Sequence, residues 1–434
     1  GTAGACSSVF YASSLFCPLR HYLDEVYVLP HLTGGWPVGY DLFKPYFDET
    51  AKLLSLRGEP DPLAEAHLPL LEPTPMCPAE ETLFEDLRGC GLHPYRTHEG
   101  FRRVPDCLNC IGNKCPRTCK MDGRSAGVEP ALETGRARLL TECTVERLVE
   151  ENGCVARIEA VVDGRRITLK GDTIVLAAGA LHSPRLLLDS GLANSSGWVG
   201  RGLMFHFLEL AALWPRRGNP AVGATRAVSF RDFYTLKGER FGFIQSMGVT
   251  ADAARIAAFL RGMIARTVLR HLPGIDKGML LAAAIGERIF GNATVLVCLI
   301  DDRPYFDNRV STHPDDPEMP LVEYTVTPEL NKRRRMIRRA TRRALGWQRT
   351  LMLGFAPEPN YGHPSGTLRF GDDPETSVRD ADCKAHDLDN LYVADASFMP
   401  TSLGVTPSFT IAANALRVAD IVAARAGVTE RKTG

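Results

Sequence analysis

The sequence predicts a two-domain α/β protein, and three observations lead to this prediction. First, 434 residues are enough for two domains that share a core. Second, an apolar strand at 173–178 leads through Gly179 into a helix whose first turn holds Pro184, where the missing N–H of proline is tolerated. In such a strand–glycine–helix unit, backbone amides meet a nucleotide at the carboxyl end of the strand. Third, strand-like runs at 295–300 and 321–326 indicate an antiparallel sheet in a second, α+β domain.

Apolar periodicity locates further helices and strands. Structure-breaking residues at Gly34 and Pro37 predict a loop, and residues 40–56 then carry apolar side chains at helical spacing. Two strand-like runs, one around Val145 and one at 155–162, are followed by an Asp-Gly pair that predicts a turn.

Two basic segments allow more than one interpretation. A helix beginning near residue 251 carries arginines among apolar side chains, as a helix lying on a membrane surface would. We favour a surface or lid helix, because amphipathicity is common to all surface helices. A second helical segment follows Pro273 and Gly274 and extends to residue 290. The Arg-rich run 332–343 predicts a solvated helix face, because its charge is too local for nucleic-acid binding.

Composition excludes several classes of function. The chain is 44% hydrophobic and 24% charged, and its formal net charge is zero. Such a chain has no long-range attraction to nucleic acid or to an anionic membrane, so a small molecule is the expected partner. No run of about 20 apolar residues occurs, so no transmembrane segment is expected. The chain opens on Gly1 with neither an initiator Met nor a signal peptide. We therefore expect a processed or truncated soluble product, cytoplasmic or periplasmic.

Three pieces near the end of the chain form one pattern. Together they give a short strand that ends in Asp395, a glycine-bearing loop and a helix that begins near Pro407. The start of that helix offers unpaired N–H groups to an anionic or electron-rich ring edge. His363, in a nearby loop, is a candidate proton acceptor near neutral pH. Taken alone, His363 would be interpreted as a surface loop residue and Asp395 as a turn residue. The prediction of a site therefore depends on their combination. The three pieces are 362–367, 389–397 and 404–411.

In order and spacing, these pieces resemble the glucose-methanol-choline (GMC) oxidoreductases. The resemblance implies FAD as cofactor and oxidation of a primary or secondary alcohol, with a sugar or polyol favoured, by hydride transfer to flavin N5. It implies that His363 takes the substrate hydroxyl proton and that Asp395 and the adjacent Ala396 help to hold the FAD. The amides after Pro407, including that of Ser408, would face the flavin pyrimidine edge.

One departure from the family pattern concerns the second active-site residue. The family commonly has Asn or His there, and the position falls on Thr406 in this chain. A threonine hydroxyl can donate a hydrogen bond but cannot act as a base. We therefore expect Thr406 to take part in catalysis only as a hydrogen-bonding group.

The resemblance spans nearly the whole chain, except for 216–290. Residues 1–8 match the glycine-rich loop that wraps the flavin diphosphate, with Ala5 and Cys6 in place of two glycines. The Gly-x-Gly-x-x-Gly fingerprint of the family would precede Gly1 and is absent. A truncated sequence, a second chain carrying the missing unit, and loss of FAD are three explanations; the retained His363 and Asp395 argue against the third. The further cofactor contacts implied by the resemblance are Ser7, Ser8, Val145, Ala178 and Gly179.

Four of the twelve cysteines form a cluster. Cys107, Cys110, Cys115 and Cys119 fall within thirteen residues, whereas zinc prefers two knuckles separated by a longer loop. The part from Cys110 to Cys119 resembles the iron–sulfur segment of bacterial FAD-dependent glucose dehydrogenases. An iron–sulfur cluster would pass electrons from flavin to an external acceptor, as in a dehydrogenase rather than an oxidase. Local disulfides and simple packing are the alternatives.

We therefore expect an FAD-binding Rossmann-like domain, incomplete at its N-terminus, and an α+β substrate domain with an antiparallel sheet. The expected function is that of an FAD-dependent alcohol or sugar dehydrogenase acting on CH–OH donors with an external electron acceptor. The alternative is a non-catalytic subunit or pseudoenzyme of the same fold that acts with a partner chain. The expected FAD-binding segments are 1–20, 137–205 and 364–434, and the expected substrate-domain segments are 21–136 and 206–363, with a Cys-rich loop at 107–119.

Overall fold

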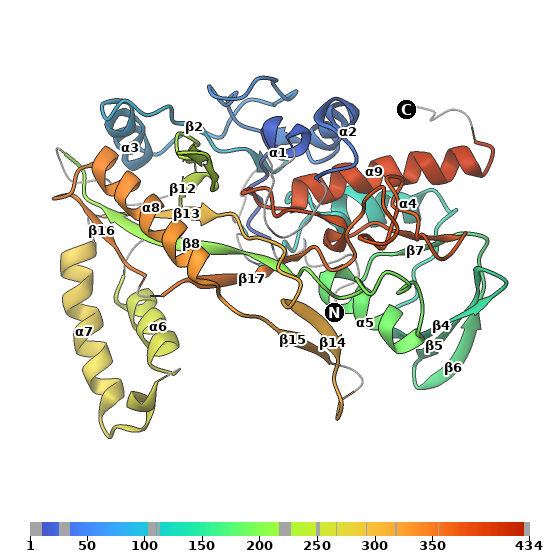
Figure 1. Ribbon diagram of the computed structural model, residues 1–434. Helices are drawn as coiled ribbons and strands as arrows, with labels where there is room; N and C mark the ends of the chain where they lie inside the picture. Colours follow the sequence, from blue (N-terminus) through green and yellow to red (C-terminus); the bar gives the residue numbers. More distant parts are fainter. Residues whose placement is uncertain are drawn as a thin grey trace.

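The structure is a computed structural model, and it confirms the predicted fold class. Figure 1 shows long antiparallel strands in one half of the molecule, and a parallel strand pair with its helices in the other. The boundaries of the two expected domains remain predictions. The residues that the structure describes are 11–25, 35–102, 110, 113–216, 227–248, 252–265, 267–291, 293–316, 319–354 and 356–428.

The larger sheet has seven strands in the order β16-β8-β13-β12-β9-β2, with β17 also paired to β8. Strand β8 is the longest of them, and its apolar run is buried along most of its length. The run predicted at 295–300 forms β13, which pairs with β8 over seven residues. The strands are β2 (Tyr95–Arg96), β8 (Met204–Leu213), β9 (Val228–Phe230), β12 (Ile244–Ser246), β13 (Thr294–Ile300), β16 (Thr350–Met352) and β17 (Glu358–Ser365).

The run predicted at 321–326 forms a separate antiparallel pair, β14 (Arg309–Thr312) with β15 (Pro320–Glu323). It ends early because Thr327 caps the next helix, α8 (Pro328–Leu345), by accepting a hydrogen bond from a backbone N–H of its first turn.

Helix α8 packs on the large sheet through buried apolar side chains. The prediction that its Arg-rich run is a solvated face is wrong for Arg333 and Arg334, which are only 1% and 8% exposed. Arg333 forms an ion pair with Glu329 one turn earlier, and Arg334 with the buried Glu209 of β8. A buried arginine is tolerated where a carboxylate pairs with it.

The parallel pair consists of β7 (Ile174–Leu176) and β18 (Leu391–Val393), and α5 (Gly179–Ser190) follows β7 directly. The strand–glycine–helix unit is thus confirmed. The placement of Pro184 in the first turn is wrong, because the helix begins at Gly179 and the proline lies inside it. The carbonyl of Ala180, which the proline cannot pair, instead accepts a hydrogen bond from Thr367 Oγ1 at 2.7 Å. Beside this unit lies the antiparallel sheet of β4 (Cys143–Glu151), β5 (Cys154–Val162) and β6 (Arg165–Leu169).

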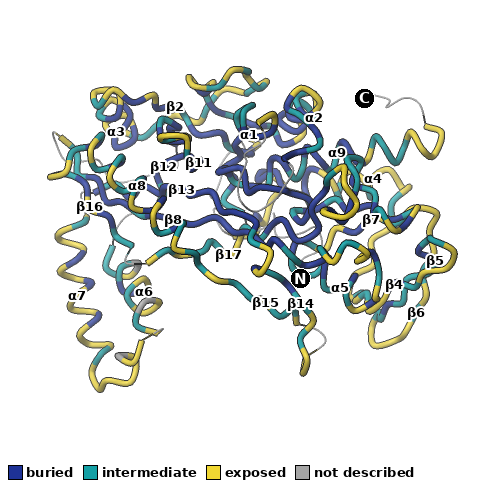
Figure 2. Tube along the Cα trace, in the orientation of Figure 1, coloured by how far each residue is buried: buried dark blue, intermediate teal, exposed yellow. Residues whose placement is uncertain are grey.

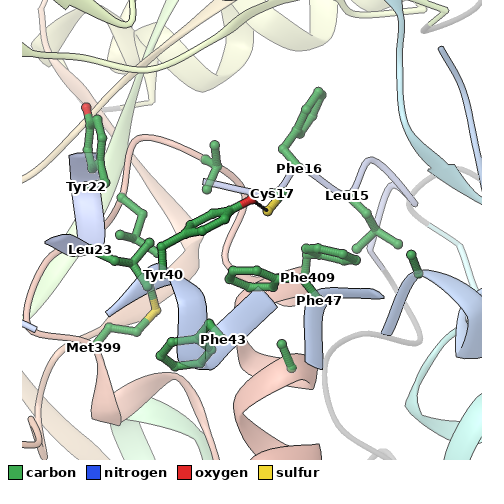
Figure 3. Packing of buried hydrophobic residues seen from close by; sticks show 14 of the residues in the cluster. Leu15, Phe16, Cys17, Tyr22, Leu23, Tyr40, Phe43, Phe47, Met399 and Phe409 are labelled. Atoms are coloured by element: carbon green, nitrogen blue, oxygen red, sulfur yellow. Dashed lines mark hydrogen bonds between the residues drawn. The ribbon is translucent and has the colours of Figure 1, made fainter. Parts of the chain in front are cut away.

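Helices from opposite ends of the chain share the main core. Helix α2 (Tyr40–Leu53) packs on α9 (Ser408–Arg425), and Figure 3 shows the aromatic rings between them. The rings of Phe43 and Phe47 have centroids 5.5 Å apart, and those of Phe47 and Phe409 are 5.7 Å apart. The helix predicted at 40–56 is confirmed but ends at Leu53, because Ser55 adopts a positive φ of 50°. Figure 2 shows this buried core running through the centre of the molecule.

The two helices predicted on either side of Pro273 and Gly274 are confirmed as α6 (Ala253–Ile264) and α7 (Ile275–Phe290), with the short η3 (Val268–His271) between them. They extend away from the large sheet (Figure 1). None of the helices that the structure describes combines the length and apolar character needed to span a bilayer. The remaining short elements are α1 (His21–Asp24), β1 (Leu56–Arg57), α3 (Pro78–Arg88), β3 (Glu99–Gly100), η2 (Gly123–Val128), α4 (Glu129–Glu133), β10 (Thr235–Leu236), β11 (Glu239–Arg240) and η4 (Ala396–Phe398).

Candidate active site

Two histidines from neighbouring strands meet at the centre of the candidate site. His363 of β17 and His206 of β8 have their Nδ1 atoms 3.2 Å apart, with ring planes at 88°. The sequence predicted a loop at His363, and the structure places it on a strand instead. The pairing of β17 with β8 shifts register between Asn360 and Ser365, so His363 stands on an irregular stretch of the strand. Such irregularities redirect side chains beside active sites.

His206 is completely buried and has partners on both sides of its ring. Its Nε2 lies 2.9 Å from the backbone oxygen of Ser402, opposite the contact with His363. Burial holds the pKa of His206 well below its ordinary value of 6.5, and the neighbouring His363 lowers it further. His206 is therefore neutral at physiological pH. His363 itself is half-buried.

The Ser402 segment that faces His206 is held by a buried polar network. Ser402 Oγ donates to the carboxylate of Asp301 and accepts from the backbone N–H of Asp302 at 2.9 Å. The Asp302 carboxylate in turn accepts from the Phe205 N–H at 2.9 Å and from the Tyr324 hydroxyl at 2.6 Å. Burial raises the pKa of Asp302 to about 7, although these hydrogen bonds oppose the shift. The network thus connects β8, the end of β13 and the Ser402 segment.

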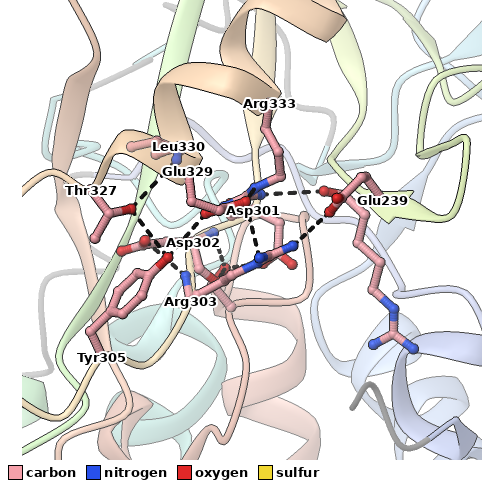
Figure 4. Close-up of polar contacts among 11 residues, drawn as sticks. Glu239, Asp301, Asp302, Arg303, Tyr305, Thr327, Glu329, Leu330 and Arg333 are labelled. Atoms are coloured by element: carbon pink, nitrogen blue, oxygen red, sulfur yellow. Dashed lines mark hydrogen bonds and ion pairs between the residues drawn. The ribbon is translucent and has the colours of Figure 1, made fainter. Parts of the chain in front are cut away.

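Arginines from two segments complete this network (Figure 4). Arg303 pairs with Glu239 at 2.6 Å and with Glu329 at 3.0 Å. Arg333 of α8 donates to the backbone oxygen of Asp301 and pairs with the same Glu329. Both buried arginines thus have a carboxylate partner, which rigidifies the region behind the histidine pair.

Asp395 organises a second part of the site. Its Oδ2 accepts from the Gly179 N–H at 2.9 Å and from the Ser183 hydroxyl, and its Oδ1 accepts from the N–H and hydroxyl of Ser397. Both oxygens thus take two donors from the chain itself, which nearly saturates a carboxylate. Asp395 therefore shapes the start of α5 and the turn of η4. The carbonyl of Ala396 in that turn accepts from Gly366 N at 3.2 Å, which links the end of β17 to the same place.

Thr406 and Pro407 lie at the start of α9. The Thr406 hydroxyl donates to the backbone oxygen of Ser14 at 3.0 Å, so its proton is already used within the chain. Two residues earlier, Gly404 has a φ of 61°, and a Cβ there would lie 2.0 Å from the carbonyl oxygen of Phe241. Only glycine fits at that position, so this contact fixes the path of the loop into α9.

The start of α9 meets the requirements of a site for an electron-rich ring edge. Pro407 caps the helix without a side-chain hydrogen bond. The N–H groups of Ser408, Phe409 and Thr410 have no hydrogen-bond partner among the described residues, and Thr410 Oγ1 is buried without one. Phe409 and Thr410 are buried, and donors of buried residues need an acceptor. The residues present therefore fit the flavin part of an FAD.

The remaining predicted cofactor residues lie at the start of α5, on β4 and near the N-terminus. Ala178 is exposed and precedes α5, and Gly179 begins that helix with a φ of 84° and open space beside it. Val145 lies on β4 beside a register shift, half-buried against the core that α5 also contacts. Ser7 and Ser8, which were predicted to contact the diphosphate, lie outside the described residues.

The three cysteines of the cluster that the structure describes form no metal site. Cys115 and Cys119 are buried thiols whose Sγ atoms lie 3.2 Å apart, and Cys110 is half-buried. Cys107 lies outside the described residues. Within the part of the chain that the structure describes, no three His, Cys, Asp or Glu side chains are grouped to hold a metal. The iron–sulfur interpretation therefore has no support in these residues.

Two family models and several known proteins match this chain in sequence. Residues 37–208 match the N-terminal model of the GMC oxidoreductases, and residues 304–415 match the C-terminal one. The chain is 30% identical to the 6'''-hydroxyparomomycin C oxidase of Streptomyces lividus over 96% of this chain and 78% of that protein. It is 27% identical to the 2-methyl-1,2-propanediol dehydrogenase of Mycolicibacterium austroafricanum, over 91% and 75% of the two.

A solved structure shows the same fold. An FAD-dependent oxidoreductase from Chaetomium thermophilum superposes with a TM-score of 0.62 at 14% identity, covering 96% of this chain and 85% of that one. None of these matches supports a separate chain for the missing glycine fingerprint. The family models and the relatives together show that the chain belongs to the GMC oxidoreductase family, whose members are flavoproteins that oxidise alcohol groups.

Proposed function

We propose that this chain is an FAD-dependent enzyme that oxidises an alcohol group of a sugar-like or polyol substrate, with His363 as the base. The observation that carries the proposal is the contact between the half-buried His363 and the neutral, buried His206. The names of the two relatives support the substrate class, because one acts on a hydroxyparomomycin and the other on a propanediol.

The chemistry divides between the cofactor and the chain. When bound, FAD supplies an acceptor for the hydride that leaves the substrate carbon. His363 accepts the hydroxyl proton, so the alcohol becomes a carbonyl compound by losing one hydride and one proton. The three unpartnered N–H groups at the start of α9 would hold the pyrimidine edge of the flavin, because the positive end of the helix dipole favours negative charge there.

Two other predicted residues have supporting roles in this proposal. Asp395 positions the start of α5 and the Ala396 turn through its four hydrogen bonds. Thr406 anchors the Ser14 segment to the start of α9, which differs from the catalytic hydrogen bond expected from the sequence. Catalysis then depends on His363 rather than on a pair of residues on the C-terminal loop.

The electron acceptor distinguishes a dehydrogenase from an oxidase. We propose a dehydrogenase that uses an external acceptor, supported by the propanediol dehydrogenase match over 91% of this chain. The paromomycin relative is named an oxidase. Turnover with a redox dye in the absence of oxygen, and little hydrogen peroxide in its presence, is the expected result. Peroxide formed in step with product would make the enzyme an oxidase.

The test of the whole proposal is a panel of sugars, polyols and aminoglycosides assayed with a dye acceptor. His363→Ala should lower turnover by at least about 100-fold while flavin absorbance stays at the wild-type level. The exposed His67 offers a matched control, and His67→Ala should retain wild-type turnover. Full activity in His363→Ala would remove this residue from the mechanism. A purified chain that binds no flavin would favour the non-catalytic alternative.

A further inference from the structure

We propose that His206 is a positioning residue that fixes the tautomer of His363 and thereby places the basic lone pair of His363 on Nε2. This inference rests on the proposed function of His363 as a base. It assigns a role to a residue of β8, which lies outside the C-terminal sequence pattern.

The first step concerns the proton on His206. A backbone carbonyl can only accept a hydrogen bond, and the oxygen of Ser402 lies 2.9 Å from His206 Nε2. That nitrogen must therefore carry the hydrogen. The Ser402 segment is itself held by Asp301 and Asp302 through the Ser402 side chain, so the acceptor has a fixed position.

The second step concerns the other ring nitrogen of His206. The ring is completely buried and neutral, so it carries a single proton. With that proton on Nε2, Nδ1 of His206 has a lone pair and can only accept. Its neighbour at 3.2 Å is Nδ1 of His363, which must then be the donor.

The third step follows for His363. A neutral imidazole with its hydrogen on Nδ1 has its basic lone pair on Nε2. When Nε2 accepts the substrate proton, the hydrogen bond from Nδ1 to His206 remains in place and stabilises the charged ring. Asn360 also faces this ring. Its Oδ1 accepts from Gly362 N at 3.1 Å, and its Nδ2 lies 3.2 Å from Nδ1 and 3.4 Å from Nε2 of His363.

The competing explanation is that His206 serves only as a core residue that joins β8 to the Ser402 segment. Two variants separate the explanations. His206→Asn keeps an acceptor near the Nδ1 position but loses the reach to Ser402. His206→Gln keeps a donor near the Nε2 position but has no acceptor facing His363.

The two variants are compared as flavin-loaded enzymes. If His206 fixes the tautomer, His206→Asn keeps kcat within about 10-fold of the wild type, and His206→Gln loses roughly 100-fold in kcat with little change in KM. A purely structural role gives the reverse order, with activity following thermal stability. That reverse order would overturn the proposal.

A measurement on the wild-type chain does not depend on activity. Histidine-selective 15N labelling and NMR report which ring nitrogen of each neutral histidine is protonated, in flavin-free and flavin-loaded protein. We expect the hydrogen on Nδ1 of His363 and on Nε2 of His206, with signals assigned by their loss in His363→Ala and His206→Gln. A neutral His363 protonated on Nε2 refutes the inference even if the enzyme is active. The expected tautomers in an inactive protein refute the proposed function instead.

Discussion

The carboxylate of Asp395 accepts a hydrogen bond from the backbone N–H of Gly179 at 2.9 Å, although 216 residues separate them. The bond joins the C-terminal motif to the strand–glycine–helix unit in the middle of the chain. It lies at the carboxyl ends of the parallel strands β7 and β18, the edge at which α/β proteins bind nucleotides. One side chain therefore connects two parts of the proposed cofactor site.

Asp395→Ala should lower the free energy of unfolding by about 3 kcal/mol, because it leaves several buried donors without an acceptor. Urea denaturation of the flavin-free protein measures this change. The side chain of Asp389, on the same segment, is 82% exposed, and Asp389→Ala should change stability by less than about 0.5 kcal/mol. Equal effects of the two substitutions would show that the Asp395 network contributes little.

Thr406→Val tests what the Thr406 hydroxyl does. Valine has nearly the same shape but cannot donate to the oxygen of Ser14, so stability should fall by about 1 kcal/mol. Turnover should change by less than about threefold, because His363 acts without help from this hydroxyl. Thr406→Ser retains the donor and serves as the control. A loss of roughly 100-fold in kcat for Thr406→Val would restore the catalytic role predicted from the sequence.

The contribution of Asp302 to stability should fall as the pH rises from about 4 to 7. Burial raises the pKa of this carboxyl from 3.8 to about 7, so the folded state retains a proton that the unfolded chain releases. The stabilisation is complete below pH 3.8 and is lost as the pH passes 7. Asp302→Asn should remove this contribution, which amounts to a change in the free energy of unfolding on the order of 3 kcal/mol over the window. Melting temperatures of the variant and the wild type at pH 4 and pH 7 measure the difference. The exposed Asp307 gives the control variant Asp307→Asn, which should follow the wild type.

Gly404→Ala should prevent normal folding of the loop that leads into α9. An added Cβ would lie 2.0 Å from the oxygen of Phe241, and the φ of 61° is itself unfavourable for alanine. We expect a loss above about 4 kcal/mol or no folded protein. Gly427→Ala has a similar φ of 78° but open space around it, so it should cost only about 1 kcal/mol. Thermal melts of both variants provide the comparison.

Elements with local signals could be predicted from the sequence. The unit around Gly179, the two helices on either side of Pro273 and the strand at 295–300 all occur where periodicity and breakers place them. These features depend on residues close together in the sequence, where propensity is informative.

The histidine pair could not be predicted in this way. His206 stands in a largely apolar strand, where a single histidine is usually a core residue, and only the pairing of β8 with β17 brings it to His363. The register shift beside His363 has no local sequence signal. The burial of Arg333 could not be predicted either, because it depends on the carbonyl of Asp301 from another segment as well as on Glu329 of its own helix. Tertiary contacts decide each of these cases.

The packing of α2 against α9 has a consequence for biosynthesis. Residues 40–53 are synthesised more than 350 residues before their partners at 408–425. In the described part of the chain, β7 pairs with β18, which is likewise synthesised much later. Until then the aromatic rings of α2 face solvent or a chaperone, since domains close only when their distant segments are present. The proposed flavin site, which includes the start of α9, is therefore completed only after residues 408–425 have been synthesised.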